Sequence, residues 1–498
     1  MVAYLRYQLT LVTTLNAPCT WNHQRRRHSH CQQSPVPFLS QPPGTLKKLS
    51  SKWMFECSAL SKQGERFFSS LANARATGDT SATNRLIKKF VAASPKSVAL
   101  DALSHLLSPH SSYHHLSSLA FPVSSSLSLS LLKATSYPSG HFLWQLYLKI
   151  TDTQWFDWNP KLVANLAALL DKQGQQKELA TLISDSTSKL QLRERDLALF
   201  YCNLVESHSK QNSIGGFDDC LARLTELVHN SNSVYVKRQG YKSMISGLCE
   251  MGRPREAEEL IDEMRGKGVK PSVFEFRCIV HAHGRLGLFE EMQRSLVQME
   301  SAGFEIDTIC SNMILSSYGV HNALPEMVLF LKKMKDLAIP FSLRTFNSVL
   351  NSCPTFMSVI QNSNAYPISI QELIEILSGD EAMLVEALAG FSVLEETMKW
   401  NALEAKLDLH GMHLGSAYLI MLLWVEEMRK RLSSGNYVIP AEITVVCGSG
   451  KHSSIRGESP VKQMVKEMMV KLRSPMRIDR KNIGCFIAKG AVVKEWLC

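Results

Sequence analysis

Residues 238–272 read RQGYKSMISGLCEMGRPREAEELIDEMRGKGVKPS, and the apolar pattern of this stretch recurs at intervals of 35 residues. Three sets of equivalent positions follow the interval: Met264, Met299 and Met334; Ile261, Leu296 and Leu331; and Ile245, Val280, Leu315 and Leu350. A period of roughly 20 to 50 residues is typical of solenoids built from stacked repeats. Each unit has room for two helices, and one hairpin alone cannot bury its apolar face. The apolar stripe is therefore predicted to form the core between stacked units.

Local signals in the first unit show where its second helix begins and ends. Pro254 suits a first helical turn, where its missing N–H costs little. Gly266, Gly268 and Pro271 then end the helix. These signals and the period define repeat units at 238–272, 273–307 and 308–342, with a partial fourth unit at 343–353.

Helical patterns flank the repeat units on both sides. Residues 83–235 are predicted to be helical with degenerate repeats, most clearly around 161–185 and 193–230. Residues 354–400 break the 35-residue register but are rich in Leu, Ile and Val. They predict helices over Ile368–Leu377 and Asp380–Trp400, so we interpret this segment as a helical linker and not as a flexible tether.

Residues 401–498 alternate between strand and helix patterns. The predicted order is a strand at Lys406–His410, a helix at Leu414–Leu432, a strand at Glu442–Cys447, a helix that starts at Ser459-Pro460, and strands at Arg477–Asp479 and Cys485–Ala488. This order predicts a small two-layer α/β sandwich. The expected fold class is thus an α-helical solenoid followed by an α/β sandwich.

Two motifs of the C-terminal domain could support phosphodiester chemistry. Asp408 and His410 share one face of their predicted strand because side chains alternate along a strand. Gly448 and Gly450 follow the next strand, where glycine lets backbone N–H groups approach an anion. The same loop adds the donors Lys451, His452 and Ser453. His410 or His452 could act as a general base, while the loop stabilises phosphoryl charge. Alternatively, Asp408 caps the following helix and His410 is a packing residue.

Both halves of the chain resemble known families. Met244–Cys249, Glu256-Ala257 and Gly268–Pro271 resemble the consensus of the pentatricopeptide repeat (PPR) family. Leu407–Met412 and Cys447–Ser453 resemble the two signatures of the small MutS-related (SMR) domain, a two-layer α/β sandwich that is a nuclease in some proteins. The loop departs from the commoner SMR form at Cys447 and Ser449. Together the halves resemble the plant organellar PPR-SMR proteins.

The PPR resemblance implies that the fifth and last residues of a unit read one base of single-stranded RNA. The fifth positions are Lys242, Arg277, Asn312 and Asn347, and the last positions are Ser272, Asp307 and Ser342. Asn312 with Ser342 resembles a pyrimidine-reading pair. Lys242 and Arg277 depart from the usual small polar residues; they could hold phosphates instead, or be ordinary basic residues on a helix surface.

Charge is unevenly distributed along the chain, which has a formal net charge of +10. Residues 1–55 contain seven Lys or Arg and no Asp or Glu, which is typical of a transit peptide, although a disordered tail is the alternative. We place the transit peptide at 1–57 and expect a chloroplast, by resemblance, with the mitochondrion as the alternative. From residue 401 onward there are 15 Lys or Arg against 9 Asp or Glu, which suits a phosphate backbone.

Other features narrow the class of protein. No apolar run approaches the length of a membrane span. The twelve cysteines show no zinc-ligand spacing, so we expect no structural metal or cofactor, and only Mg²⁺ for cleavage stays open. The leading interpretation is an organellar RNA-binding protein that acts in RNA processing, stability or translation. The first alternative is an endoribonuclease whose repeats position the RNA; the second is a scaffold that binds protein partners.

Overall fold

The computed structural model describes residues 61–76, 80–107, 140–361, 367–390, 393–434, 437–448 and 459–498. The transit peptide expected at 1–57 lies outside these residues. The chain divides into two compact units, and the second contains all residues from Asp157 onward. None of the described helices is long and apolar enough to cross a membrane.

The first compact unit is helical. Its helices are α2 (Lys62–Ala76), α3 (Thr80–Ala93), α4 (Lys96–Leu107) and most of α7 (Gly140–Thr151). Helix α2 begins well before residue 83, where the sequence pattern placed the first helix. The rings of Phe67 and Phe90 stack with their centroids 3.9 Å apart and join α2 to α3.

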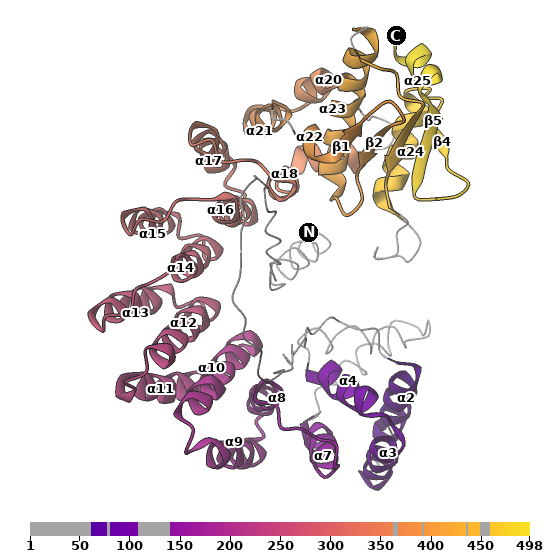
Figure 1. Ribbon diagram of the computed structural model, residues 1–498. Helices are drawn as coiled ribbons and strands as arrows, with labels where there is room; N and C mark the ends of the chain where they lie inside the picture. The colour runs from indigo at the N-terminus through magenta and orange to yellow at the C-terminus, as the bar shows by residue number, and fades with distance from the viewer. Residues whose placement is uncertain are drawn as a thin grey trace, which may run out of the picture. The chain divides into compact units, whose positions relative to one another are not determined.

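The second unit begins with a solenoid of helical hairpins (Figure 1). Each hairpin consists of a first helix and a second helix. The pairs are α8 (Pro160–Lys172) with α9 (Gln176–Leu190); α10 (Glu194–Gln211) with α11 (Ile214–Asn230); α12 (Val234–Glu250) with α13 (Pro254–Gly266); α14 (Val273–Arg285) with α15 (Phe289–Ser301); α16 (Thr308–Val320) with α17 (Leu324–Asp336); and α18 (Leu343–Leu350) with α19 (Pro354–Gln361). The first helices pack against one another in the order α8, α10, α12, α14, α16, α18, and we call them the inner row.

The prediction that the 35-residue stripe forms the core is confirmed. All ten of its side chains are at most 3% exposed. Helix α12 begins at Val234, four residues before the first repeat unit defined from the period, because Ser233 caps it by accepting a hydrogen bond from the Val236 N–H. The period therefore predicts the buried core positions more accurately than it predicts where the helices begin and end.

Small residues let the inner helices approach closely. A Cβ placed on Gly284 in α14 would lie 2.6 Å from Ser317 Cβ in α16 and 2.8 Å from Met292 Sδ. Arg285 then joins neighbouring repeats, because its Nη2 donates to the carbonyls of Cys249 and Glu250 at the end of α12, at 2.7 Å each. A cation at a helix C-terminus is also electrostatically favourable.

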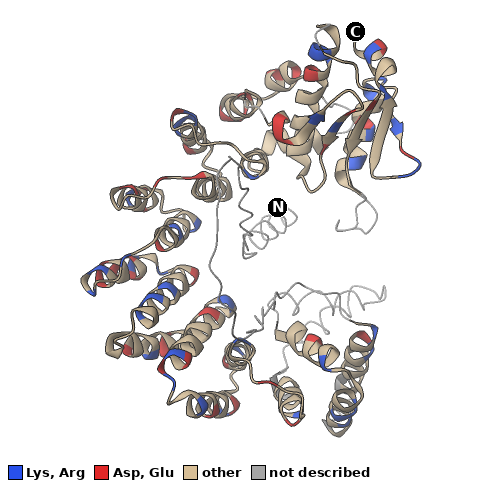
Figure 2. Ribbon diagram, viewed as in Figure 1, with Lys and Arg blue, Asp and Glu red and all other residues tan. Residues whose placement is uncertain are grey.

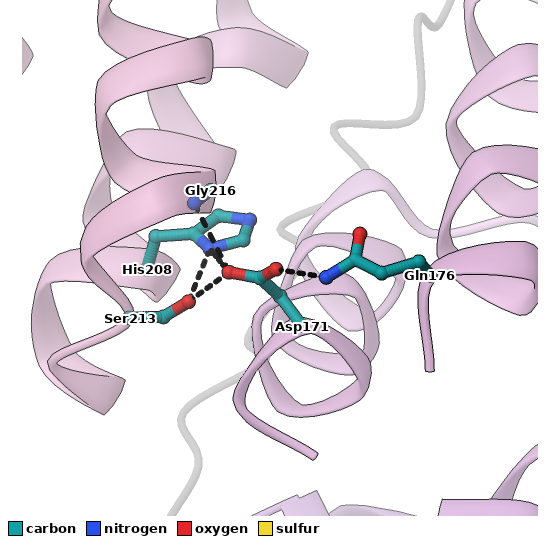
Figure 3. A network of polar contacts seen from close by, with 5 residues as sticks. All are labelled: Asp171, Gln176, His208, Ser213 and Gly216. Atoms are coloured by element: carbon teal, nitrogen blue, oxygen red, sulfur yellow. Dashed lines mark hydrogen bonds and ion pairs between the residues drawn. The ribbon is translucent and has the colours of Figure 1, made fainter. Parts of the chain in front are cut away.

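A buried polar network joins the two most N-terminal hairpins of the solenoid (Figure 3). Asp171 at the end of α8 accepts hydrogen bonds from the Ser213 hydroxyl, Gln176 and the Gly216 N–H. His208 in α10 is 1% exposed, and its Nδ1 lies 3.3 Å from Ser213 Oγ and 3.7 Å from the Asp171 carboxylate. Burial lowers the pKa of His208, although Asp171 and Asp219 act in the opposite direction.

Short helices connect the solenoid to the C-terminal domain. They are α20 (Ile370–Ile376), α21 (Gly379–Ala389) and α22 (Leu394–Thr397). Helix α21 packs beside α17 and α18. The prediction of a helix through Trp400 is wrong at its end: Met398–Trp400 form strand β1, because they pair antiparallel with residues 405–407.

In the C-terminal domain, the described residues form a five-stranded sheet and three helices. The strands are β1, β2 (Glu404–Asp408), β3 (Glu442–Val446), β4 (Arg477–Ile478) and β5 (Cys485–Lys489), in the order β1-β2-β3-β5-β4. The helices are α23 (Leu414–Ser433), α24 (Pro460–Lys471) and α25 (Gly490–Leu497). Only β2 and β3 are parallel. Burial alternates along both strands, so one face of the sheet carries the core. Neither β1 nor α25 was expected from the sequence.

We predict that Gly284→Ala destabilises the protein by about 1–3 kcal/mol, because the added methyl group meets α16 and Met292. The matched control is Gly266→Ala at the end of α13, where a Cβ meets nothing within 4 Å. That change should be neutral or stabilising, since alanine favours helix. Urea midpoints followed by circular dichroism measure both effects; equal midpoints for the two variants would contradict the close packing.

The His208 network predicts a loss of stability at mildly acidic pH. The folded pKa of His208 lies below the unfolded value of about 6.5. The unfolded chain therefore takes up the proton first, and the stability present above about pH 6.5 is lost as the pH falls below it. Unfolding midpoints at about pH 7.5 and 5.5 should differ less in His208→Gln than in the wild type. An identical pH dependence in both proteins would show that His208 does not contribute.

Candidate nucleic-acid interface

The last residue of each repeat unit is the N-cap of the next inner helix. Ser272, Asp307 and Ser342 have extended backbones, and their side chains accept backbone N–H groups of α14, α16 and α18. Ser, Asp and Asn are the residues that satisfy such free N–H groups best. The following inner helix packs on the preceding one, so its N-cap can reach the fifth residue of the preceding unit.

In the second unit the fifth and last residues form an ion pair. Arg277 Nη2 lies 2.5 Å from Asp307 Oδ2. The guanidinium is mostly buried, and its Nε has no hydrogen-bond partner among the described residues. The positive charge of Arg277 is thus already matched by a carboxylate within the protein.

In the third unit the two residues are joined by hydrogen bonds. Asn312 Nδ2 donates to Ser342 Oγ at 3.1 Å, and Asn312 Oδ1 accepts from Thr345 Oγ1 at 2.8 Å. Thr345 also accepts a hydrogen bond from the Ser342 N–H at 2.9 Å. Because Thr345 is fully buried, it holds the carbonyl end of the Asn312 amide in one orientation.

The first unit is arranged differently. Lys242 is exposed, and its Nζ lies 4.5 Å above the ring of Phe274. The Ser272 hydroxyl donates to Glu275 at 2.6 Å, within a capping box. Among the described residues no hydrogen bond joins Lys242 to Ser272, so in this unit, unlike the other two, the fifth and last residues do not contact each other through their polar groups.

Asn347, the fifth residue of the partial fourth unit, contacts the C-terminal domain. Asn347 Oδ1 accepts a hydrogen bond from Ser416 Oγ of α23 at 2.7 Å. Ser416 is fully buried. Asn347 therefore has a partner outside the repeats, which the 35-residue period gave no means of finding.

Asp408 and His410 meet at the carboxyl edge of the sheet. His410 Nδ1 lies 2.6 Å from Asp408 Oδ1, and the His410 N–H donates to the same oxygen at 3.1 Å. The His410 side chain is 69% exposed. Since β2 and β3 are parallel, Gly448 follows β3 at the same edge, where a Cβ on it would lie 3.7 Å from His410 Cβ. Gly448 has a φ of +80°, which favours glycine.

Four other residues expected at this edge lie outside the described residues: Gly450, Lys451, His452 and Ser453. Ser459, the N-cap of α24, donates its hydroxyl to the Cys447 carbonyl at 3.3 Å and so places a helix N-terminus beside β3. Burial raises the pKa of Cys447 to about 12, an effect to which Cys485 adds. Its thiol is thus neutral and is not a candidate nucleophile.

Sequence reasoning missed the residues that support these positions. Thr345 and Ser416 orient asparagines, and Phe274 lies under Lys242. Lys399 stands opposite Lys406 on β1 and β2, and Arg477 belongs to the same cross-strand row. Basic residues recur over the sheet and in the β4–β5 turn (Figure 2). Lys399 and Lys406 are brought opposite each other by the pairing of β1 with β2, and β1 was not expected from the sequence.

Comparison with known proteins agrees with this architecture. The family model described as "PPR repeat" matches residues 241–269. The pentatricopeptide repeat-containing protein At2g17033 of Arabidopsis thaliana is 55% identical over 439 residues, which cover 88% of this chain and 82% of the relative. The chloroplastic pentatricopeptide repeat-containing protein ATP4 of Zea mays is 21% identical over 281 residues, covering 52% of this chain and 38% of ATP4.

Among solved structures, the chain is similar to the pentatricopeptide repeat protein PPR10 from maize, with 13% identity and a TM-score of 0.34 over 83% of this chain and 60% of PPR10. The stacked hairpins define a helical repeat protein. Given its identity to the Arabidopsis relative over most of both chains, the protein belongs to the pentatricopeptide repeat family.

Proposed function

We propose that this protein binds single-stranded RNA in a plant organelle, through its inner row and its C-terminal α/β domain, and acts in RNA processing, stability or translation. The observation that carries the proposal is the Asn312–Ser342 pair, oriented by the buried Thr345. Membership of the pentatricopeptide repeat family supports it. The chloroplastic relative from maize supports an organelle, with the chloroplast preferred.

The arrangement explains how one base would be read. Thr345 donates to Asn312 Oδ1 and one Nδ2–H is donated to Ser342 Oγ, so the second Nδ2–H remains for a base acceptor. The Ser342 hydroxyl can both donate and accept. Sequence-specific recognition of RNA uses the Watson–Crick edges of unstacked bases, which present such groups. The third unit is therefore the preferred base reader.

The second and first units fit different roles. Arg277 is neutralised by Asp307, so a phosphate would have to compete with a 2.5 Å ion pair. Among the described residues no carboxylate forms an ion pair with Lys242, which lies beside the ring of Phe274, a residue that is 37% exposed. A cation and a ring together suit a phosphate and a stacked base. We assign phosphate binding to Lys242 before Arg277.

The α/β domain resembles the SMR domain, and we propose that it also contacts RNA. Lys399 and Lys406 are directly opposite on neighbouring strands, an arrangement that is unfavourable without a nearby negative charge. No ion pair within 4 Å joins either lysine to a described carboxylate. A phosphate backbone would supply the negative charge.

The Asp408–His410 pair favours a second candidate function, endoribonuclease activity. If the neutral ring donates its Nδ1–H to Asp408, Nε2 is left as an acceptor. Nε2 then takes the proton of a 2′-hydroxyl whose oxygen attacks the neighbouring phosphate, while Asp408 stabilises the imidazolium. As the bond from phosphorus to the 2′-oxygen forms, the bond to the 5′-oxygen breaks, which leaves a 2′,3′-cyclic phosphate, and the departing 5′-oxygen takes a proton from water. Within the described residues no group of three or more metal-ligating side chains gathers.

RNA binding predicts two separable mutational effects. Asn312→Thr combined with Ser342→Asp should change the preferred base at one position of a bound oligonucleotide, with discrimination of about 1–3 kcal/mol. Lys242→Ala should weaken binding to all sequences and reduce the salt slope by about one unit. Fluorescence anisotropy at several salt concentrations measures both. Equal affinity of the wild type and the double variant for every base would show that the third unit reads none.

Cleavage predicts that Asp408→Asn and His410→Ala lower the rate by roughly 100-fold or more, as expected for a general base. RNA affinity should hardly change. The control is His229→Ala, because His229 forms a similar exposed pair with Glu263, at 2.5 Å, within the repeats. The assay follows labelled RNA with the full chain, with and without Mg²⁺. If the wild type cuts no faster than Asp408→Asn, the domain only binds.

A further inference from the structure

Helices α14, α16 and α18 each contact the fifth residue of the unit before them through their N-terminal turns. The N-cap turn of α16 supplies Asp307 to Arg277, and that of α18 supplies Ser342 and Thr345 to Asn312. After α18 the inner row has no further repeat helix. Helix α23 of the α/β domain packs on α18 instead (Figure 1).

Polar and apolar contacts hold α23 against the last hairpin. Besides the Ser416–Asn347 hydrogen bond, His413 Nδ1 lies 2.5 Å from Asn351 Nδ2. A Cβ on Gly415 would lie 2.9 Å from a ring carbon of Phe356, so only glycine allows this approach. Ser416, Gly415 and Phe356 are all buried.

Helix α23 crosses the inner row and does not continue it. Between α16 and α18, the order of contacts is parallel: Asn312 meets Ser342, and Ser316 meets Ser348 further along both helices. Between α18 and α23 the order reverses. Contacts move forward from Asn347 to Asn351 on α18 but backward from Ser416 to His413 on α23. No N-cap therefore stands beside Asn347 as Ser342 stands beside Asn312.

The connecting helices fix this arrangement. The buried Glu381 carboxylate of α21 accepts the N–H groups of Thr355 and Phe356, at 3.0 and 2.8 Å, and so caps α19. Tyr418 of α23 donates its hydroxyl to the Pro367 carbonyl at 2.7 Å. The α/β domain is thus packed onto the solenoid end through several elements, which restricts movement between them.

We propose that the contact between α18 and α23 sets the register between the repeats and the α/β domain on a bound RNA. This inference rests on the proposed RNA binding. Asn347 is a positioning residue and not a base reader, and the base-reading positions end at Asn312–Ser342. His413 is exposed beside Asn351, and His410 lies three positions before it in the chain, a span of at most about 11 Å. The RNA that leaves the third unit therefore meets the Asp408–His410 edge at a fixed number of nucleotides from the base that Asn312 reads.

The test uses the full-length protein and an RNA that it selects from a random pool. A 4-thiouridine is placed in turn at each position around the nucleotide whose preference depends on Asn312. Crosslinked peptides are identified by mass spectrometry. In the wild type, crosslinks to residues 408–413 should come from one or two adjacent positions, on one side of that nucleotide.

Two sets of variants separate positioning from reading. Ser416→Ala should broaden the crosslinks to residues 408–413 over several positions or abolish them, with unchanged base preference, whereas Ser434→Ala at the exposed end of α23 should do neither. Asn312→Thr should change the base preference at one position, and the same substitution at Asn347 should change none. If Ser416→Ala does not fold, Asn351→Ala replaces it as a milder change of the contact between α18 and α23.

The possible results distinguish a failure of this inference from a failure of the proposed RNA binding. A change of base preference in Asn347→Thr would overturn the inference while RNA binding stands. Wild-type crosslinks to residues 408–413 from scattered positions, or from none, would overturn it as well. Absence of any RNA binding by the wild type would contradict the proposed function itself, and the inference with it.

Discussion

The structure depends on one contact, the packing of the N-terminal turn of an inner helix against the fifth residue of the unit before it, as α14, α16 and α18 show. Thr345 and Ser342 illustrate it, because they cap α18 and also bond both ends of the Asn312 amide. A single turn thus satisfies free backbone groups, joins two repeats and places two polar side chains together. Stability and recognition are therefore coupled, since a buried amide that loses its partners is costly.

The same contact explains why the units differ in chemistry. Where the fifth residue is Arg277, the cap is an aspartate and the pair is ionic. Where it is Lys242, the cap Ser272 is held by Glu275, and the lysine lies over Phe274 instead. At the end of the row, Asn347 meets α23, which crosses the row. Only the third unit combines a neutral pair with an amide of fixed orientation.

The sequence predicted what depends on local patterns and failed where distant residues decide. The 35-residue period found the buried stripe, and Ser459-Pro460 marked the start of α24, because helical spacing and caps are local signals. Strand β1 was missed because three residues become a strand only through pairing with β2. The partner of Asn347 lies 69 residues away, beyond the reach of any period. Asp408 and His410, two residues apart, were correctly predicted to lie together, but the strand predicted to run to His410 ends at Asp408. His410 lies in the following turn, where its N–H donates to the Asp408 carboxylate.

The central claim is that the N-terminal turns of the inner row form the RNA-binding surface. Hydrogen–deuterium exchange of the full chain, with and without selected single-stranded RNA, tests it directly. RNA bound at these turns should slow exchange in the peptides that begin α14, α16 and α18 and in residues 408–413, with little change in the second helices α13, α15 and α17. Protection confined to those second helices, or none at all with RNA bound, would contradict it.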